Sequence, residues 1–221
     1  MTTIRLEGPT AQPASGRAAR QLVVLLHGVG ADGDDLIGLA PYFAQVLPDA
    51  AFASPHAPFP YDMAPFGRQW FSLADRSPQA IARGVRAAAP IVDAFLDESL
   101  AALGLGDDAL ALIGFSQGTM MALHVAMRRS RRMRAVLGYS GMMADPASLP
   151  AEITARPRTL LIHGEADDVV APTALAAATA ALEAVGVPVT AHAEPNLGHG
   201  LSDQGIAMGM AFLAQAFLDP T

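Results

Sequence analysis

The chain has 221 residues, of which 52% are hydrophobic and 16% are charged, and its formal net charge is −7. This length and apolar content exclude a disordered chain, and the negative charge argues against a general binder of nucleic acids or anionic membranes. The absence of cysteine excludes disulfide bonds, a thiol nucleophile and thiolate metal sites.

The first 20 residues lack the apolar core of a secretory signal. No apolar run of the sequence approaches the roughly 18 residues that a membrane-spanning helix needs. We therefore expect a cytoplasmic protein without membrane insertion. The length fits a single α/β domain over residues 1–221, in which residues 1–20 would form a partly flexible N-terminal extension.

In the first half of the chain, the apolar run at residues 22–26 predicts a buried parallel strand, and residues 34–46 predict a helix that is apolar on one face. A weaker strand is expected at residues 50–53. Ser77 followed by Pro78 is typical of a helix start. That helix should run toward Leu103, bend near Pro90 and stop at Gly104.

An irregular segment follows the second strand, and it contains five aromatic side chains: Phe59, Tyr61, Phe66, Trp70 and Phe71. A long aromatic loop on an α/β sheet either packs as a compact Ω-loop or forms the wall of a pocket. The two roles are compatible, and the sequence leaves both open.

In the second half of the chain, apolar runs predict four further strands, of which the last is weak: residues 109–115, 134–139, 159–162 and 187–193. Three more helices are expected, the first apolar nearly all round: residues 117–129, 172–185 and 205–218. This alternation of strands and helices predicts an α/β fold with a mostly parallel central sheet flanked by helices.

Five arginines lie within seven residues, from Arg128 to Arg134. They could form a site for an anion or a protein partner. The favoured interpretation is a solvated helix C-terminus, where cations complement the helix dipole.

The loop after the first strand, residues 28–33, reads G-x-G-x-x-G, a pattern found in dinucleotide-binding turns. Such a turn needs an acidic residue for the ribose at the end of the second strand, but that strand ends in Ala53, Ser54 and Pro55. Asp32 and its acidic neighbours would also repel a pyrophosphate. An oxidoreductase that uses a nicotinamide cofactor is therefore the disfavoured alternative.

Residues 114–118 form a G-x-S-x-G motif around Ser116, with a predicted strand directly before it and a predicted buried helix directly after it. This context is what a nucleophile elbow needs, because a sharp and strained turn presents the serine oxygen. The free N–H of Gln117 at the helix start can donate to an oxyanion. Ser116 is the predicted nucleophile.

A serine hydroxyl needs a base to remove its proton. Among the six histidines, His199 lies in a loop between the last strand and the last helix, where this architecture places the base. His27 and His163 each end a strand as an H-G pair and are interpreted as structural or loop-orienting.

A third group should orient the imidazole. The loop after the strand at residues 159–162 carries Glu165, Asp167 and Asp168. The chain order of serine, then acid, then histidine matches the α/β-hydrolase order. Spacing alone does not separate Asp167 from Asp168.

Six segments resemble the carboxylesterase and acyl-protein thioesterase branch of the α/β hydrolases: residues 26–33, 55–58, 70–71, 114–118, 163–172 and 197–199. The resemblance covers nearly the whole chain and implies the α/β-hydrolase fold. It implies that the acid is Asp167, four residues after His163, and that the N–H of Val29 joins that of Gln117 in an oxyanion hole. Residues 140–157 are too few for a large cap domain.

The expected enzyme is a serine hydrolase with Ser116, Asp167 and His199 as catalytic residues, and this mechanism needs neither a metal nor an organic cofactor. The resemblance implies small carboxylic esters as substrates, and we expect short to medium acyl chains. The expected acyl contacts are Trp70, Phe71, Leu73, Met142 and Leu201.

Two alternatives for the function remain at this point. Some relatives in this branch act on S-acylated proteins or lysophospholipids, so an acyl-protein thioesterase or a lysophospholipase is the first. A non-catalytic binding protein with the same fold is the second, and the presence of all three catalytic residue types argues against it. Homologous enzymes dimerise in some cases, but no feature of the sequence decides whether this chain forms a homodimer.

Overall fold

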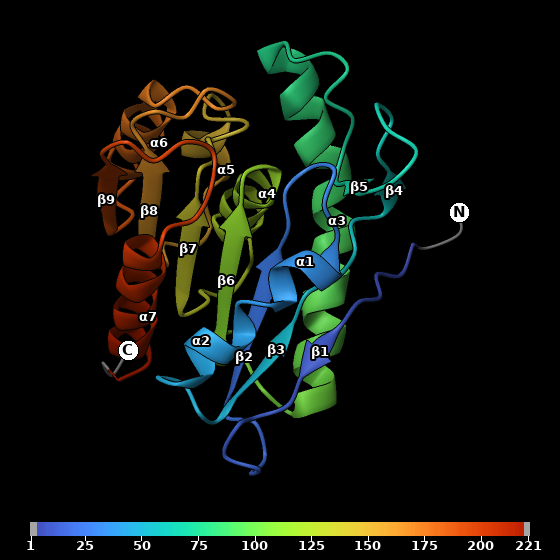
Figure 1. Cartoon of the computed structure of the whole chain (residues 1–221), viewed down its shortest axis with the longest axis vertical. Helices are drawn as coiled ribbons and strands as arrows, with labels where there is room; N and C mark the ends of the chain where they lie inside the picture. The colour runs from blue at the N-terminus through green and yellow to red at the C-terminus, as the bar shows by residue number, and fades with distance from the viewer. Residues whose placement is uncertain (1–3, 219–221) are drawn as a thin grey trace.

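The structure is a computed structural model that describes residues 4–218, and a seven-stranded sheet with helices on both faces forms its centre (Figure 1). The strand order is β1-β3-β2-β6-β7-β8-β9, and every pair is parallel except β1 with β3. The strands are β1 (Thr10–Ala11), β2 (Gln21–Leu26), β3 (Ala50–Ala53), β6 (Leu110–Phe115), β7 (Ala135–Tyr139), β8 (Arg158–Gly164) and β9 (Val189–Glu194). The predicted mostly parallel sheet is confirmed.

The helices divide between the two faces of the sheet: α1 (Gly33–Ile37), α2 (Ala40–Ala44) and α7 (Asp203–Leu218) on one, and α3 (Pro78–Leu103), α4 (Gln117–Ala126) and α6 (Thr173–Glu183) on the other. Successive side chains of a strand point to opposite faces. Leu22 and Val24 of β2 therefore join the core under α3 and α4, while Val23 and Leu25 join the core under α1, α2 and α7.

The long helix α3 begins and ends where its sequence predicts. The Ser77 hydroxyl accepts a hydrogen bond from the N–H of Ala80 and caps the start. Gly104 ends the helix in the left-handed conformation, with φ 66°. The helix continues as one element through Pro90.

The single helix predicted at residues 34–46 is wrong. Two short helices, α1 and α2, occupy this segment, and Gly38 and Leu39 separate them. Pro41 lies in the first turn of α2, where its missing N–H costs no hydrogen bond. Several predicted boundaries also shift by a few residues. For example, residues 107–109 form a 3₁₀ turn before β6, and α4 ends at Ala126.

The N-terminal segment contributes to the sheet in the part that the structure describes. β1 pairs with β3 and forms one edge of the sheet, and Leu6 is buried. No helix within residues 4–218 is both long enough and apolar enough to cross a membrane. Between β7 and β8 the chain forms only the short helix α5 (Leu149–Glu152), so no cap domain covers that end of the sheet.

The aromatic segment forms a small hairpin of β4 (Phe59–Pro60) and β5 (Arg68–Gln69). Its side chains divide into buried and exposed ones, and the predicted role as a pocket wall stays a prediction. Trp70 and Phe71 pack into the core, whereas Met63 and Phe66 at the tip are 64% and 76% exposed. The hairpin also touches the glycine-rich loop, because the N–H of Gly30 donates to the carbonyl of Arg68.

Candidate active site

The candidate residues gather at the carboxyl edge of the parallel strands. The loops that follow β2, β6 and β8 meet the loop between β9 and α7 at this edge (Figure 1). Binding sites of open parallel sheets lie at this edge, because the loops that leave the strands converge there.

Ser116 occupies a strained turn between β6 and α4. Its φ of 53° and ψ of −117° lie in a region that residues other than glycine rarely adopt. The N–H of Ser116 donates to the carbonyl of Tyr139, which holds the turn in place. Gly118 allows the helix to approach the sheet, since a Cβ there would lie 1.8 Å from the carbonyl oxygen of Leu26. The sharp turn predicted from the motif is present.

His199 connects the serine to a carboxylate. Its Nε2 lies 3.0 Å from Ser116 Oγ, and its Nδ1 lies 2.8 Å from Asp167 Oδ2. Asp167 Oδ1 accepts hydrogen bonds from the N–H groups of Val169 and Val170, both at 2.9 Å. An ionised carboxylate can only accept a hydrogen bond, so Nδ1 must be the donor. The proton of the neutral imidazole is therefore on Nδ1, and the lone pair of Nε2 faces the serine.

The two adjacent aspartates have different environments. The side chain of Asp167 is 0% exposed, whereas Asp168 is exposed to solvent. Burial by itself raises the pKa of Asp167, but hydrogen bonds from His199, Val170 and Val169 outweigh it and hold the pKa below its usual range. Asp167 is therefore the carboxylate that contacts His199 in its ionised form.

A second histidine also contacts this carboxylate. His163 Nε2 lies 3.2 Å from Asp167 Oδ2 and 2.9 Å from the carbonyl oxygen of Val170, and the residue is 2% exposed. The sequence analysis predicted that His163 ends a strand but did not predict its contact with Asp167. The spacing of four residues between the two was the only feature of the sequence that could have indicated this contact.

The glycine-rich loop lies against the serine. A Cβ on Gly28 would lie 3.3 Å from the Cβ of Ser116, so the backbone at Gly28, next to Val29 in the chain, is within contact distance of the elbow. Gln117 is the first residue of α4, where backbone N–H groups have no partner within the helix. The two predicted oxyanion donors, Val29 and Gln117, therefore come from segments that flank Ser116.

The same loop does not provide a free helix N-terminus for a phosphate. Asp32 caps α1, and its Oδ1 accepts from the N–H groups of Asp34 and Asp35 at 2.9 and 3.4 Å. Asp32 and Asp34 lie near His56 in a cluster of metal-ligand type. However, His56 Nδ1 accepts from the N–H of Gly33, so its Nε2 bears the proton and is not a free ligand.

The five predicted acyl contacts fall into two groups. Leu73, Met142 and Leu201 are half-buried and retain exposed surface. Trp70 is 0% exposed and Phe71 is 4% exposed. The expectation that Trp70 contacts an acyl chain directly is wrong for this structure, because the packing of the indole in the core leaves no surface for a ligand.

Comparison with known proteins decides the class to which this site belongs. The model of the phospholipase/carboxylesterase family matches residues 11–217. The chain belongs to this family. The predicted enzyme class, a serine hydrolase of carboxylic ester or thioester bonds, and the predicted α/β-hydrolase fold are thereby confirmed.

Individual known proteins are similar to this chain over most of their length. The chain is 32% identical to the esterase YpfH of Escherichia coli K12 over 204 residues, which cover 89% of this chain and 83% of that protein. It is 24% identical to acyl-protein thioesterase 1 of Schizosaccharomyces pombe over 189 residues, or 80% and 81% of the two chains. The crystal structure of esterase PE8 superposes with a TM-score of 0.92 and 39% identity, over 96% of this chain and 99% of that one.

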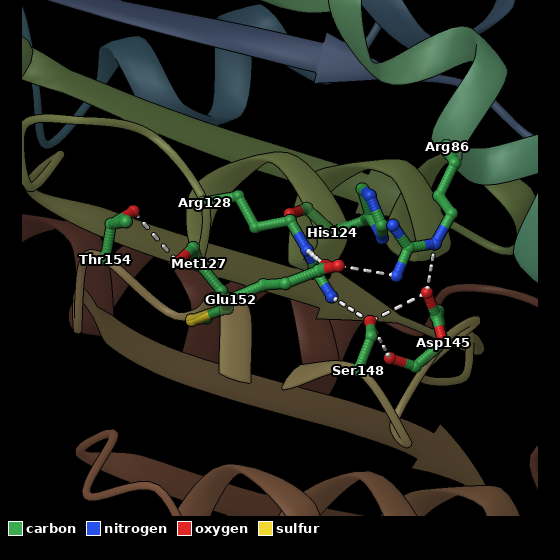
Figure 2. A network of polar contacts seen from close by, with 8 residues as sticks. All are labelled: Arg86, His124, Met127, Arg128, Asp145, Ser148, Glu152 and Thr154. Carbon is green, nitrogen blue, oxygen red and sulfur yellow. Dashed lines mark hydrogen bonds and ion pairs between the residues drawn. The ribbon is translucent and has the colours of Figure 1, made fainter. Parts of the chain in front are cut away.

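Outside the site, the arginine cluster at residues 128–134 takes part in a polar network (Figure 2). Arg86 and Arg128 both bind Glu152 at 2.8 Å, and Arg86 also binds Asp145 at 2.7 Å. Arg129 is 8% exposed and pairs with three carboxylates: Asp93, Asp97 and Asp107. Arg128 and Arg129 therefore join α4 to neighbouring segments, and the prediction of a solvated helix end is wrong for them.

His124 lies in α4 beside this network (Figure 2), is 4% exposed, and its Nδ1 has no hydrogen-bond partner within the described residues. Burial, reinforced by the charge of Arg128, lowers the pKa of His124 from 6.5 to about 4. The unfolded chain then binds a proton that the folded protein excludes as the pH falls from 6.5 to 4. We expect His124 alone to reduce the free energy of unfolding by up to about 3 kcal/mol across this window.

Urea denaturation at several pH values in this window measures the effect. In His124→Gln, the loss of stability on acidification should be smaller than in the wild type by that amount. An unchanged pH dependence in this variant would show that other groups cause the acid sensitivity.

Proposed function

We propose that the protein is a serine carboxylesterase that hydrolyses short to medium-chain carboxylic esters, with Ser116, His199 and Asp167 as its catalytic triad. The observation that carries the proposal is the continuous pair of hydrogen bonds from Ser116 Oγ through His199 to Asp167, at 3.0 and 2.8 Å. A nucleophile and a base within hydrogen-bond reach, with the base oriented by a third group, are the requirements of this chemistry.

In the proposed reaction, Ser116 Oγ attacks the carbonyl carbon of the ester, and His199 Nε2 takes the hydroxyl proton. The N–H groups of Val29 and Gln117 donate to the oxyanion of the tetrahedral intermediate. The intermediate collapses to an acyl-serine when His199 returns the proton to the leaving alcohol. Water then attacks the acyl-serine with His199 again as base, releasing the acid and restoring Ser116. Asp167 stabilises the imidazolium that forms in each half of the reaction.

Three observations support ester substrates of modest length. Two similar proteins, YpfH and PE8, are named as esterases. The segment between β7 and β8 forms only the short helix α5, so no cap encloses a long chain there. The half-buried side chains of Leu73, Met142 and Leu201 supply apolar surface for a short acyl group.

A panel of p-nitrophenyl esters from acetate to palmitate, assayed beside a palmitoyl-cysteine peptide, tests the substrate class. We expect kcat/KM to be highest for short to medium acyl chains and lower for the peptide thioester. A higher kcat/KM for the peptide than for every oxygen ester would instead identify an acyl-protein thioesterase. An absence of turnover, together with no labelling by a fluorophosphonate, would identify a non-catalytic binding protein.

A further inference from the structure

The two proposed donors of the oxyanion hole lie on two separate segments of the chain, a loop and a helix. Val29 belongs to the loop after β2, and Gln117 begins α4. An oxyanion hole works only when both N–H groups lie about 2.7–3.1 Å from the same oxygen. Some contact must therefore fix the position of the glycine-rich loop relative to the helix.

The side chain of Gln117 provides the first link. Its amide group is completely buried and binds the segment after β5. Oε1 accepts from the N–H of Trp70 at 2.9 Å, and Nε2 donates to the carbonyl of Phe71 at 2.7 Å. These two hydrogen bonds join residues 70–71 to the first turn of α4.

The indole of Trp70 provides the second link. Its Nε1–H donates to the carbonyl of His27 at 2.9 Å. Its ring also packs on the imidazole of His27, with the ring centroids 5.4 Å apart. Trp70 thus contacts both α4 and the residue that begins the glycine-rich loop.

The imidazole of His27 provides the last link. Its Nε2 accepts from the N–H of Ala57 at 2.9 Å, so the proton is on Nδ1, which lies 2.7 Å from the carbonyl oxygen of Gly28. Burial lowers the pKa of His27 and thereby favours this neutral form. The carbonyl of Gly28 and the N–H of Val29 belong to one planar peptide unit, so fixing the carbonyl also fixes the direction of the N–H.

We propose that Trp70 is a positioning residue that couples the two halves of the oxyanion hole, through Gln117 on one side and His27 on the other. The proposal rests on the assignment of Val29 and Gln117 as oxyanion donors. It gives Trp70 a role in the stability of the transition state, in place of the substrate contact expected from the sequence.

Trp70→Phe tests the proposal, because it removes the indole N–H and retains an aromatic ring. We expect kcat for a p-nitrophenyl ester to fall about 10- to 100-fold while KM changes by less than about twofold, since the loss affects only the transition state. The affinity for butylboronic acid, which forms a tetrahedral adduct with the serine, should fall by a similar factor. End-point titration with a fluorophosphonate counts the folded active sites, so kcat is corrected for misfolded protein.

Thr159→Val is the matched control. Thr159 is 2% exposed and its hydroxyl donates to the carbonyl of Pro157, at the opposite end of the sheet. Like Trp70→Phe, this variant removes one buried hydrogen bond to a backbone carbonyl. Because the lost bond is far from the site, the variant should retain the wild-type kcat and boronate affinity. A fall in kcat equal to that of Trp70→Phe would show that the effect arises from general destabilisation and would overturn the proposal.

A pair of His27 variants tests the same link if Trp70→Phe does not fold. The amide nitrogen of an asparagine can reach the position of Nδ1 and donate to Gly28, whereas a glutamine reaches the position of Nε2. We expect His27→Asn to retain about tenfold more kcat than His27→Gln. Trp70 is the chain's single tryptophan, so an unchanged emission maximum checks that the indole stays buried in both variants.

The outcomes separate this proposal from the proposed function. Unchanged kcat and boronate affinity in Trp70→Phe, a rise in KM alone, or equal activity of the two His27 variants would each overturn the positioning role and leave the serine mechanism intact. Full turnover after replacement of Ser116 would overturn the mechanism itself.

Discussion

Ser116→Ala is expected to lower kcat for p-nitrophenyl esters by about 10⁴- to 10⁶-fold. The alanine has no oxygen to attack the carbonyl, so His199 has no proton to accept and the acyl-serine cannot form. The proposed oxyanion donors, Val29 and Gln117, remain in place and should leave a small rate above that of the uncatalysed reaction. Stopped-flow and steady-state hydrolysis of the same ester measure the acylation burst and the turnover; the burst should disappear and the turnover should fall to this small residual rate.

Ser130→Ala is the control for this experiment, because Ser130 is an exposed residue after α4. It should retain wild-type turnover and react fully with a fluorophosphonate. If Ser116→Ala kept wild-type activity, the enzyme would use a different nucleophile, and the contact between His199 and Ser116 would have no catalytic meaning.

Asp167→Asn is expected to lower kcat by about 10⁴-fold, nearly as much as loss of the nucleophile. The introduced amide can donate to His199 Nδ1, which places the imidazole proton on Nε2, facing Ser116. The base then has no lone pair for the serine proton. The amide oxygen can still accept from Val169 and Val170, so the loop should keep its conformation.

Asp168→Asn is the matched control, because it makes the same chemical change one residue away on an exposed side chain. Its kcat should stay within about twofold of wild type. Thermal unfolding of both variants, measured beside their kcat values, separates a catalytic loss from a stability loss. A larger loss of kcat in Asp168→Asn would move the acid of the triad by one residue.

The elbow shows why part of the site could be predicted from sequence. A strand, a turn with Ser116 between two glycines, and a buried helix are contiguous, so local patterns specify all three and the strained φ of 53° follows from them. Local patterns gave a wrong prediction between Asp34 and Val46, where a single helix was expected. The apolar residues of that segment would lie on one face of a continuous helix. The chain nevertheless breaks at Gly38 and Leu39, and the spacing of the apolar residues does not show this break.

The choice between Asp167 and Asp168 had a different basis. Their spacing from the strand left both open, and a family resemblance favoured Asp167. In the structure, Asp167 is the one that lies 2.8 Å from His199, and its other oxygen binds two backbone N–H groups.

The sequence by itself determined the mostly parallel α/β fold, the nucleophile motif at Ser116 and the candidate base His199, because periodicity and short motifs record local structure. The choice of Asp167 over Asp168 needed the family resemblance. Only the tertiary structure decided which side chains are buried and what they touch. The contact between Trp70 and His27 joins residues 43 apart, and the contact between Trp70 and Gln117 joins residues 47 apart. Such contacts depend on how the sheet brings distant loops to one edge, and no local pattern contains that information.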